Sequence, residues 1–163
     1  MKRLLAAPAL ALLLALAPAA WAASFHGTVT HVTDGDTLWV RPDHGGAPVP
    51  LRLAGLDAPE ICQAFGPQAA QALRARVLRQ PVTVRTRGSD DFGRQLARVQ
   101  HRREDLGRWL VRHGFAWSAG FQGRTGPYTR EQALARAERR GLWAAPAPLE
   151  PRRFRRRFGS CHS

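Results

Sequence analysis

Alternating apolar and polar positions along much of the chain predict a series of short β-strands. Five segments show this pattern: residues 26–33, 36–40, 49–53, 81–85 and 94–101. Such alternation is typical of strands that bury one face and expose the other. The dipeptide Asp34-Gly35 between the first two segments predicts a tight hairpin, because both residue types tolerate positive φ.

Apolar residues three and four positions apart predict a helix after the third strand and another after the fifth. The first starts at Gly66-Pro67 and ends before Pro81. The second covers residues 106–113, follows a capping acid at position 104 or 105, and ends at Gly114.

A last helix is predicted by Thr129 and Gln132, whose spacing is that of a capping box. Its pattern places Ala133, Leu134 and Ala137 on the inward face, with the helix ending at Gly141. Five strands with interspersed helices predict an α+β fold, namely a five-stranded OB-fold β-barrel with about three α-helices. We assign residues 23–145 to this domain and residues 146–163 to a Pro- and Arg-rich C-terminal tail.

Residues 1–22 have the pattern of a signal peptide. Lys2 and Arg3 precede an apolar run over residues 4–16, and Ala20-Trp21-Ala22 forms a small-x-small cleavage site. We therefore expect cleavage after Ala22, a secreted or periplasmic protein, and no membrane span in the mature chain. The alternative is an uncleaved anchor, but the run is shorter than the roughly 20 residues that span a bilayer.

The charge of the chain is strongly positive. The formal net charge is +13, and loss of residues 1–22 would remove two basic and no acidic residues, leaving +11. A small domain with this charge is attracted to polyanions such as nucleic acid, or to an anionic membrane surface. A cationic envelope protein that binds such a surface is therefore one alternative function.

Four of the twelve acidic residues nevertheless fall in two short motifs, Asp34 with Asp36 and Asp57 with Glu60. Asp36 and Asp57 are candidate ligands of a hard cation such as calcium or magnesium, because both donate carboxylate oxygen. The alternative for Asp34 and Asp36 is that both only form the turn. Turn formation does not explain the second motif.

Three further charged residues are candidates for the chemistry of phosphodiester cleavage. Glu60 could act as general base toward a water molecule. Arg52 and Arg94 could stabilise negative charge on a phosphoryl group. The alternative for Glu60 is a solvated loop acid or an acid at the N-terminus of the following helix. The alternatives for Arg52 and Arg94 are an outward strand arginine and a turn arginine.

In combination these segments resemble the thermonuclease (staphylococcal nuclease-like) family. The motifs that carry the resemblance are Asp34-Gly35-Asp36-Thr37, Arg52-Leu53-x-Gly55-x-Asp57-Ala58-Pro59-Glu60 and Phe92-Gly93-Arg94-x-Leu96-Ala97. The likeness extends from about Phe25 to Trp143, and the order and spacing of the motifs make it specific.

The resemblance implies a calcium-dependent endonuclease that hydrolyses DNA and RNA and leaves 3′-phosphate ends. We also expect a monomer. The resemblance implies that Asp36, Asp57 and the backbone carbonyl of Ala58 bind the metal, and that Asp34 is an acid next to these ligands that does not itself bind the metal. It also implies that Glu60 is the base and that Arg52 and Arg94 bind phosphate. Asp91-Phe92 departs from the Lys-Tyr pair of the best-known member. A non-catalytic OB-fold module that binds nucleic acid is the alternative.

The two cysteines, Cys62 and Cys161, are the only ones in the chain. An even number in an exported protein predicts a disulfide, and two free thiols are the alternative. Five arginines surround two phenylalanines over residues 152–158. This segment could contact phosphate, or it could form a short helix whose phenylalanines face the barrel. A disulfide would hold it beside the Glu60 loop.

Overall fold

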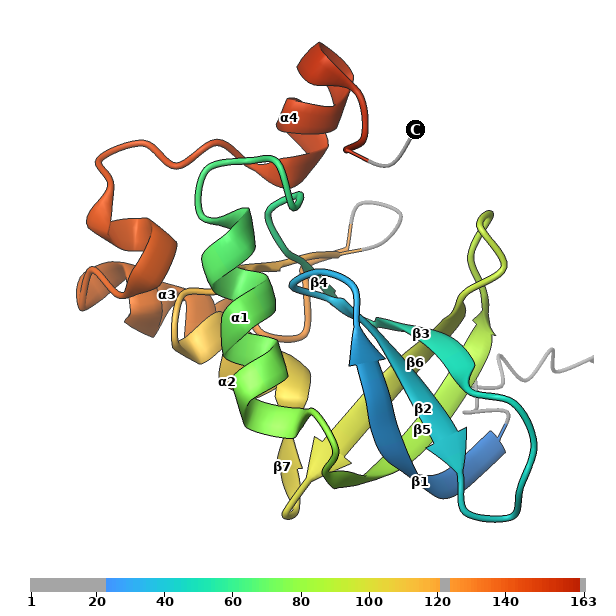
Figure 1. The fold of residues 1–163 in the computed structure, drawn as a ribbon. Helices are drawn as coiled ribbons and strands as arrows, with labels where there is room; N and C mark the ends of the chain where they lie inside the picture. The colour runs from blue at the N-terminus through green and yellow to red at the C-terminus, as the bar shows by residue number, and fades with distance from the viewer. Residues whose placement is uncertain (1–22, 121–123, 162–163) are drawn as a thin grey trace, which may run out of the picture.

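Five strands close into a β-barrel in the computed structural model, which describes residues 23–120 and 124–161 (Figure 1). The barrel strands are β1 (Ala23–Val32), β2 (Thr37–Pro42), β3 (Val49–Leu53), β5 (Pro81–Ser89) and β6 (Gln95–His101). Neighbours in the order β3-β2-β1-β5-β6 pair antiparallel, and a parallel pairing of β3 with β6 closes the ring. The predicted α+β fold with an OB-type barrel is confirmed. The predicted signal peptide lies outside the described residues.

Inward-facing positions of the strands fill the barrel interior. Successive side chains of a strand point to opposite faces, so every second residue can be buried. Along β2, Leu38 and Val40 are fully buried while Trp39 between them is exposed. Leu51 and Leu53 of β3 and Val84 of β5 extend the same core. The alternation seen in the sequence therefore marks the inward faces correctly.

Two helices follow the prediction. α1 (Gly66–Val77) begins with a proline in its first turn and buries Ala69, Ala70, Leu73 and Val77. α2 (Leu106–Arg112) is capped by the side chain of Asp105, which accepts a hydrogen bond from the amide of Arg108 at 2.9 Å. Gly114 follows with φ of 74°, a conformation that favours glycine after a helix. Asp105 also belongs to the short strand β7 (Glu104–Asp105), which pairs antiparallel with β6.

The third helix differs from the prediction in its cap and in its buried face. α3 (Thr129–Ala137) has Tyr128 at its N-cap position without a side-chain cap. The predicted capping box is wrong because both side chains bond elsewhere. Thr129 donates to the carbonyl of Gly126, and Gln132 accepts from the amide of Ser118.

α3 buries Ala135, whereas the predicted inward residues Ala133, Leu134 and Ala137 are exposed. The side chain of Gln132 accepts a hydrogen bond from the amide of Ser118 in the short strand β8 (Trp117–Ser118). In this orientation of α3, Ala135 faces inward. α3 ends before Gly141, which instead starts a 3₁₀ turn, η1 (Gly141–Ala144).

A fourth helix, α4 (Pro151–Phe158), forms within the predicted tail, one more than the three expected. Figure 1 shows it beyond the barrel and close to the loop that leads into α1. Of the two tail phenylalanines, Phe154 is half-buried and Phe158 is exposed, so only one side of this helix is covered. Within the described ranges, no helix has the length and apolar character required to cross a membrane.

Gly35 brings the β1–β2 connection close to two other segments. Its φ is not positive, contrary to the predicted reason for a glycine in this hairpin. A Cβ atom at this position would lie 2.7 Å from the Cβ of Ala58 and 2.9 Å from the Cβ of Ala69. Glycine is therefore required here for close packing, and this packing places the Asp34–Asp36 turn against the segment that carries Asp57.

Candidate active site

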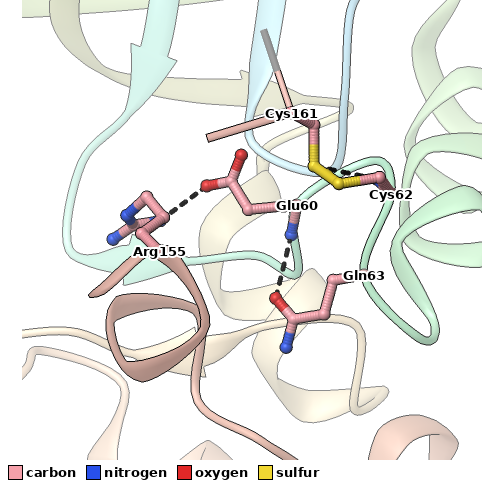
Figure 2. The surroundings of a disulfide bond; sticks show 5 residues. All are labelled: Glu60, Cys62, Gln63, Arg155 and Cys161. Atoms are coloured by element: carbon pink, nitrogen blue, oxygen red, sulfur yellow. Dashed lines mark hydrogen bonds and ion pairs between the residues drawn. A yellow bond between two sulfur atoms is a disulfide. The ribbon is translucent and has the colours of Figure 1, made fainter. Parts of the chain in front are cut away.

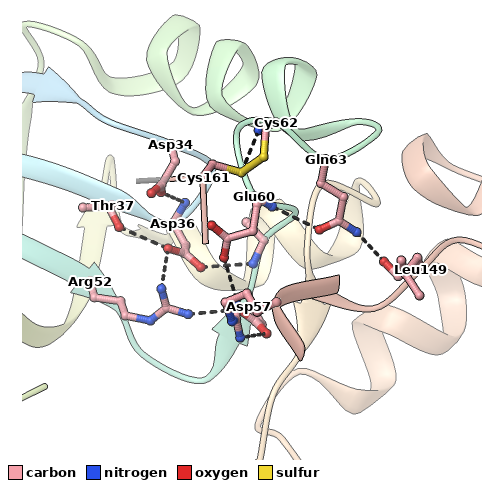
Figure 3. A network of polar contacts seen from close by, with 12 residues as sticks. Asp34, Asp36, Thr37, Arg52, Asp57, Glu60, Cys62, Gln63, Leu149 and Cys161 are labelled. Atoms are coloured by element: carbon pink, nitrogen blue, oxygen red, sulfur yellow. Dashed lines mark hydrogen bonds and ion pairs between the residues drawn. A yellow bond between two sulfur atoms is a disulfide. The ribbon is translucent and has the colours of Figure 1, made fainter. Parts of the chain in front are cut away.

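Asp36 lies at the start of β2 with its side chain only 4% exposed. One carboxylate oxygen, Oδ2, accepts a hydrogen bond from the amide of Ala58 at 3.0 Å. The other, Oδ1, accepts from the guanidinium of Arg52 at 3.0 Å and from the hydroxyl of Thr37 at 3.2 Å. Asp34 accepts the amide hydrogen of Asp36 and so orders the turn (Figure 3).

Arg52 joins the two predicted metal carboxylates. Its Nη1 donates to Asp36 and its Nη2 donates to Asp57, each at 3.0 Å (Figure 3). The barrel sets this geometry, because Arg52 of β3 is the register partner of Thr37, which follows Asp36. Asp57 belongs to a separate short strand, β4 (Leu56–Asp57), which pairs with β8. Three segments of the chain thus meet at one guanidinium.

Burial and attraction oppose each other at these groups. Burial raises the pKa of the Asp36 carboxyl to about 6, although the positive charge of Arg52 partly offsets this shift. Burial also disfavours the charge on Arg52, but attraction by Asp36 and then Asp57 outweighs it and raises the pKa of the guanidinium. Additional positive charge beside Asp36 would therefore favour its ionised form.

Glu60 lies in the loop between β4 and α1, with its side chain 14% exposed. Its amide donates to the side-chain oxygen of Gln63 at 3.2 Å, and its carbonyl accepts from the amide of Gln63. Gly66 packs directly on this turn, since a Cβ there would lie 1.8 Å from the Glu60 carbonyl oxygen. The start of α1 therefore fixes the backbone at Glu60.

Arg94 reaches the edge of this group from the turn before β6. Its Nη1 donates to the hydroxyl of Thr37 at 3.1 Å, and Thr37 in turn donates to Asp36. Its Nε donates to Asp90 at 2.8 Å, and its Nη2 forms an ion pair with the same carboxylate at 2.7 Å. Asp90 also accepts the amide hydrogens of Phe92 and Arg94. These hydrogen bonds outweigh the effect of burial and lower the pKa of Asp90. Asp90 thus orients Arg94, a role that the sequence did not single out.

Arg155 is a site residue that the sequence did not single out. From α4 its guanidinium donates to both oxygens of Asp57, at 3.1 and 2.9 Å, and to Glu60 at 2.8 Å. Figure 2 shows the Arg155 side chain directed at the Glu60 carboxylate. No local motif predicts a contact across 98 residues. The only signal was the cysteine pair that brings the tail to this loop.

The tail is attached to the Glu60 loop at two further points. Cys62 and Cys161 form a disulfide, as Figure 2 shows. The side-chain amide of Gln63 donates to the carbonyl of Leu149 at 2.5 Å. Glu60 is therefore held from one side by the barrel and α1, and from the other by the C-terminal tail.

The carboxylates of Asp36 and Asp57 could hold one hard cation. Among the residues that the structure describes, no cluster of three or more His, Cys, Asp or Glu side chains is suited to a metal. The two carboxylates nonetheless face the same guanidinium, and burial disfavours the charge of one of them. Oxygen-only donors fit Ca²⁺ or Mg²⁺, whose coordination is completed by backbone carbonyls, water or substrate.

Comparisons with known proteins identify the family of this chain. The profile of the family described as "Staphylococcal nuclease homologue" matches residues 50–145. The chain is 39% identical to "Protein ParB" of Escherichia coli, over 93% of this chain and 89% of that protein. It is 35% identical to "Micrococcal nuclease" of Shigella flexneri, over 93% and 92%. It is also 34% identical to an "Uncharacterized endonuclease" of Haemophilus influenzae, over 78% and 71%. The chain belongs to the staphylococcal nuclease homologue family.

Proposed function

We propose that this nuclease is an exported, divalent-cation-dependent endonuclease that hydrolyses DNA, RNA or both and leaves 3′-phosphate ends. Family membership and the nuclease-named relatives support a phosphodiester hydrolase. The observation that carries the finer proposal is the convergence of Asp36 and Asp57 on Arg52, with Glu60 held next to Asp57.

Asp36, Asp57 and the backbone carbonyl of Ala58 would hold the cation, which we propose to be Ca²⁺. When bound, the ion supplies positive charge that stabilises a phosphoryl oxygen as negative charge develops. The carboxylate of Asp36 is held by hydrogen bonds from the amide of Ala58 and the hydroxyl of Thr37. The side chain of Asp34 orders the same turn by accepting a hydrogen bond from the amide of Asp36.

Glu60 would accept a proton from the attacking water. The water oxygen bonds to phosphorus as the bond from phosphorus to the 5′-oxygen breaks, which gives a 3′-phosphate and a 5′-hydroxyl. Arg52 and Arg94 would donate hydrogen bonds to the phosphoryl oxygens during this step. Asp90 supports this role of Arg94, because it fixes the guanidinium while Nη1 points toward Thr37 beside Asp36.

Export is supported by the signal-peptide pattern of residues 1–22 and by the disulfide between Cys62 and Cys161. Disulfides persist in oxidising compartments such as the periplasm or the extracellular medium. Cell fractionation of the full-length chain, with N-terminal sequencing of the product, tests this expectation. Recovery of a chain that still contains residues 1–22 in the cytoplasm would contradict it.

The activity itself can be tested with the purified mature chain. It is incubated with single- and double-stranded DNA and with RNA while Ca²⁺ is titrated against a chelator, and product ends are identified by mass spectrometry. We expect cation-dependent cleavage with 3′-phosphate products. Binding of either polymer without cleavage at any cation concentration would favour the non-catalytic OB-fold module instead.

A further inference from the structure

Arg155 occupies the carboxylates that the proposed cation would need. Its Nη1 lies 3.1 Å from Oδ1 of Asp57, and its Nη2 lies 2.9 Å from Oδ2. Nη1 also lies 2.8 Å from Oε1 of Glu60. One guanidinium thus covers both oxygens of a proposed metal ligand and one oxygen of the proposed base.

The hydrogen bonds to Asp57 leave little room for another cation. Oδ1 accepts from Arg52 as well as from Arg155, so three donors are directed at the two oxygens. An ionised carboxylate offers about four lone-pair sites to donors or to a metal, and these donors take three of them. Arg52 bridges the two aspartates and belongs to the barrel, so Arg155 is the group that can withdraw.

We propose that Arg155 is an internal cation that competes with the divalent cation for Asp57 and Glu60, and thereby sets the metal affinity of the site. This inference rests on the proposed metal site. Arginine stays charged at any relevant pH, so its charge can leave the site only by movement of the side chain. A divalent cation and this guanidinium repel each other at contact distance, so the binding of one to Asp57 weakens the binding of the other.

The tail keeps Arg155 at the site. The disulfide fixes the end of the tail to Cys62, and the carbonyl of Leu149 before α4 is bonded to Gln63. Phe154, the residue directly before Arg155 in α4, lines an apolar pocket with Phe65 and Leu142. An intramolecular competitor of this kind has a high effective concentration that does not depend on the protein concentration.

The side chain of Arg155 is also exposed enough to move away from Asp57 and Glu60. Its side chain is 31% exposed, compared with 22% for Arg52. Water can therefore solvate the guanidinium when a metal displaces it, without movement of α4. The same position next to the site would let Arg155 bind a substrate phosphate, but that role predicts weaker nucleic-acid binding on its removal and no gain in metal affinity.

The test is a calorimetric Ca²⁺ titration of the oxidised mature protein without substrate. The variants are Arg155→Gln, Arg155→Lys and, as a matched control, Arg156→Gln, which removes the same charge from an exposed position of the same helix. We expect Arg155→Gln to bind Ca²⁺ about tenfold more tightly than the wild type, the scale of a charged hydrogen-bond pair. The Ca²⁺ affinity of Arg155→Lys should lie between those of the wild type and Arg155→Gln, because lysine keeps the charge but cannot make the bidentate contact.

The matched control should stay within about twofold of the wild type, as expected for an exposed charge in salt. A Cys62→Ser/Cys161→Ser variant, shown to be folded by circular dichroism, should move toward the affinity of Arg155→Gln. Equal or weaker Ca²⁺ binding by Arg155→Gln than by the wild type would overturn the inference about Arg155. If the wild type still binds Ca²⁺ and Asp57→Asn abolishes that binding, the proposed metal site would stand. If neither the wild type nor any Arg155 variant binds the cation, both proposals fail.

Discussion

The site has two halves that are held in different ways. Asp36, Arg52 and Asp57 lie against the barrel, and their side chains are between 4% and 22% exposed. Arg155 comes from α4, is 31% exposed, and depends on the disulfide and on Gln63 for its position. In the proposed mechanism, the barrel half fixes the geometry of the chemistry, while the tail half adjusts how easily a cation reaches it.

Removing the disulfide breaks the covalent link between the two halves. We expect this change to have the largest effect on stability. The disulfide links residues 99 positions apart, and opening a loop of that length costs about 4.7 kcal/mol in the chain-entropy treatment. Chemical denaturation of Cys62→Ser/Cys161→Ser measures the loss. A destabilisation below about 1 kcal/mol would show that the tail is held mainly by its other contacts.

The barrel half is tested by Asp36→Asn, which removes a charge and keeps the side-chain shape. We expect turnover to fall by about 100-fold or more, the scale of losing one preorganised charge at an active site. Steady-state cleavage at saturating cation measures this. Asp43→Asn, at an exposed turn of the barrel, is the matched control. Equal rates in Asp36→Asn and Asp43→Asn would reject the assignment of the site.

The junction between the halves is tested by Gly66→Ala. The new Cβ would lie 1.8 Å from the Glu60 carbonyl oxygen, so the backbone of the loop has to move. We expect a loss of about 2 kcal/mol in the free energy of unfolding, typical of overpacking, and reduced turnover. Gln68→Ala, exposed in the first turn of α1, should stay near wild type. Unchanged stability of Gly66→Ala would mean that this loop is more adaptable than its packing indicates.

A smaller effect is expected from Gln63→Ala. The buried side chain accepts from the amide of Glu60 and donates to the carbonyl of Leu149, so it bridges loop and tail. Its removal should lower the free energy of unfolding by about 1 kcal/mol, because these backbone groups lose one partner each. Thermal unfolding with and without the disulfide checks this. If the loss is the same in both backgrounds, Gln63 acts within the loop and does not fasten the tail.

The same division explains what the sequence could predict. Strand alternation and turn residues are local signals, so they marked the barrel and the segments that carry Asp36, Arg52 and Asp57. The contact between Arg52 and Asp36 spans 16 residues and follows from the pairing of neighbouring strands. The two halves of the site thus differ in how far apart their partners lie in the chain.

The tail contacts could not be predicted in this way. Arg155 meets Asp57 across 98 residues, and five similar arginines in one short segment gave no reason to choose it. The errors in α3 have a related cause. Thr129 and Gln132 fit a local capping box, yet Gln132 bonds to Ser118 of β8, a tertiary contact that also decides which face is buried.

The most direct measurement is a crystal structure of the mature protein from crystals grown with Ca²⁺, with an anomalous difference map to locate the ion. We expect one calcium peak about 2.4 Å from oxygens of Asp36, Asp57 and the carbonyl of Ala58. The guanidinium of Arg155 should then have left Asp57. A calcium peak elsewhere, or an ordered Arg155 still bonded to both Asp57 and Glu60 at saturating calcium, would contradict the assignment of these residues.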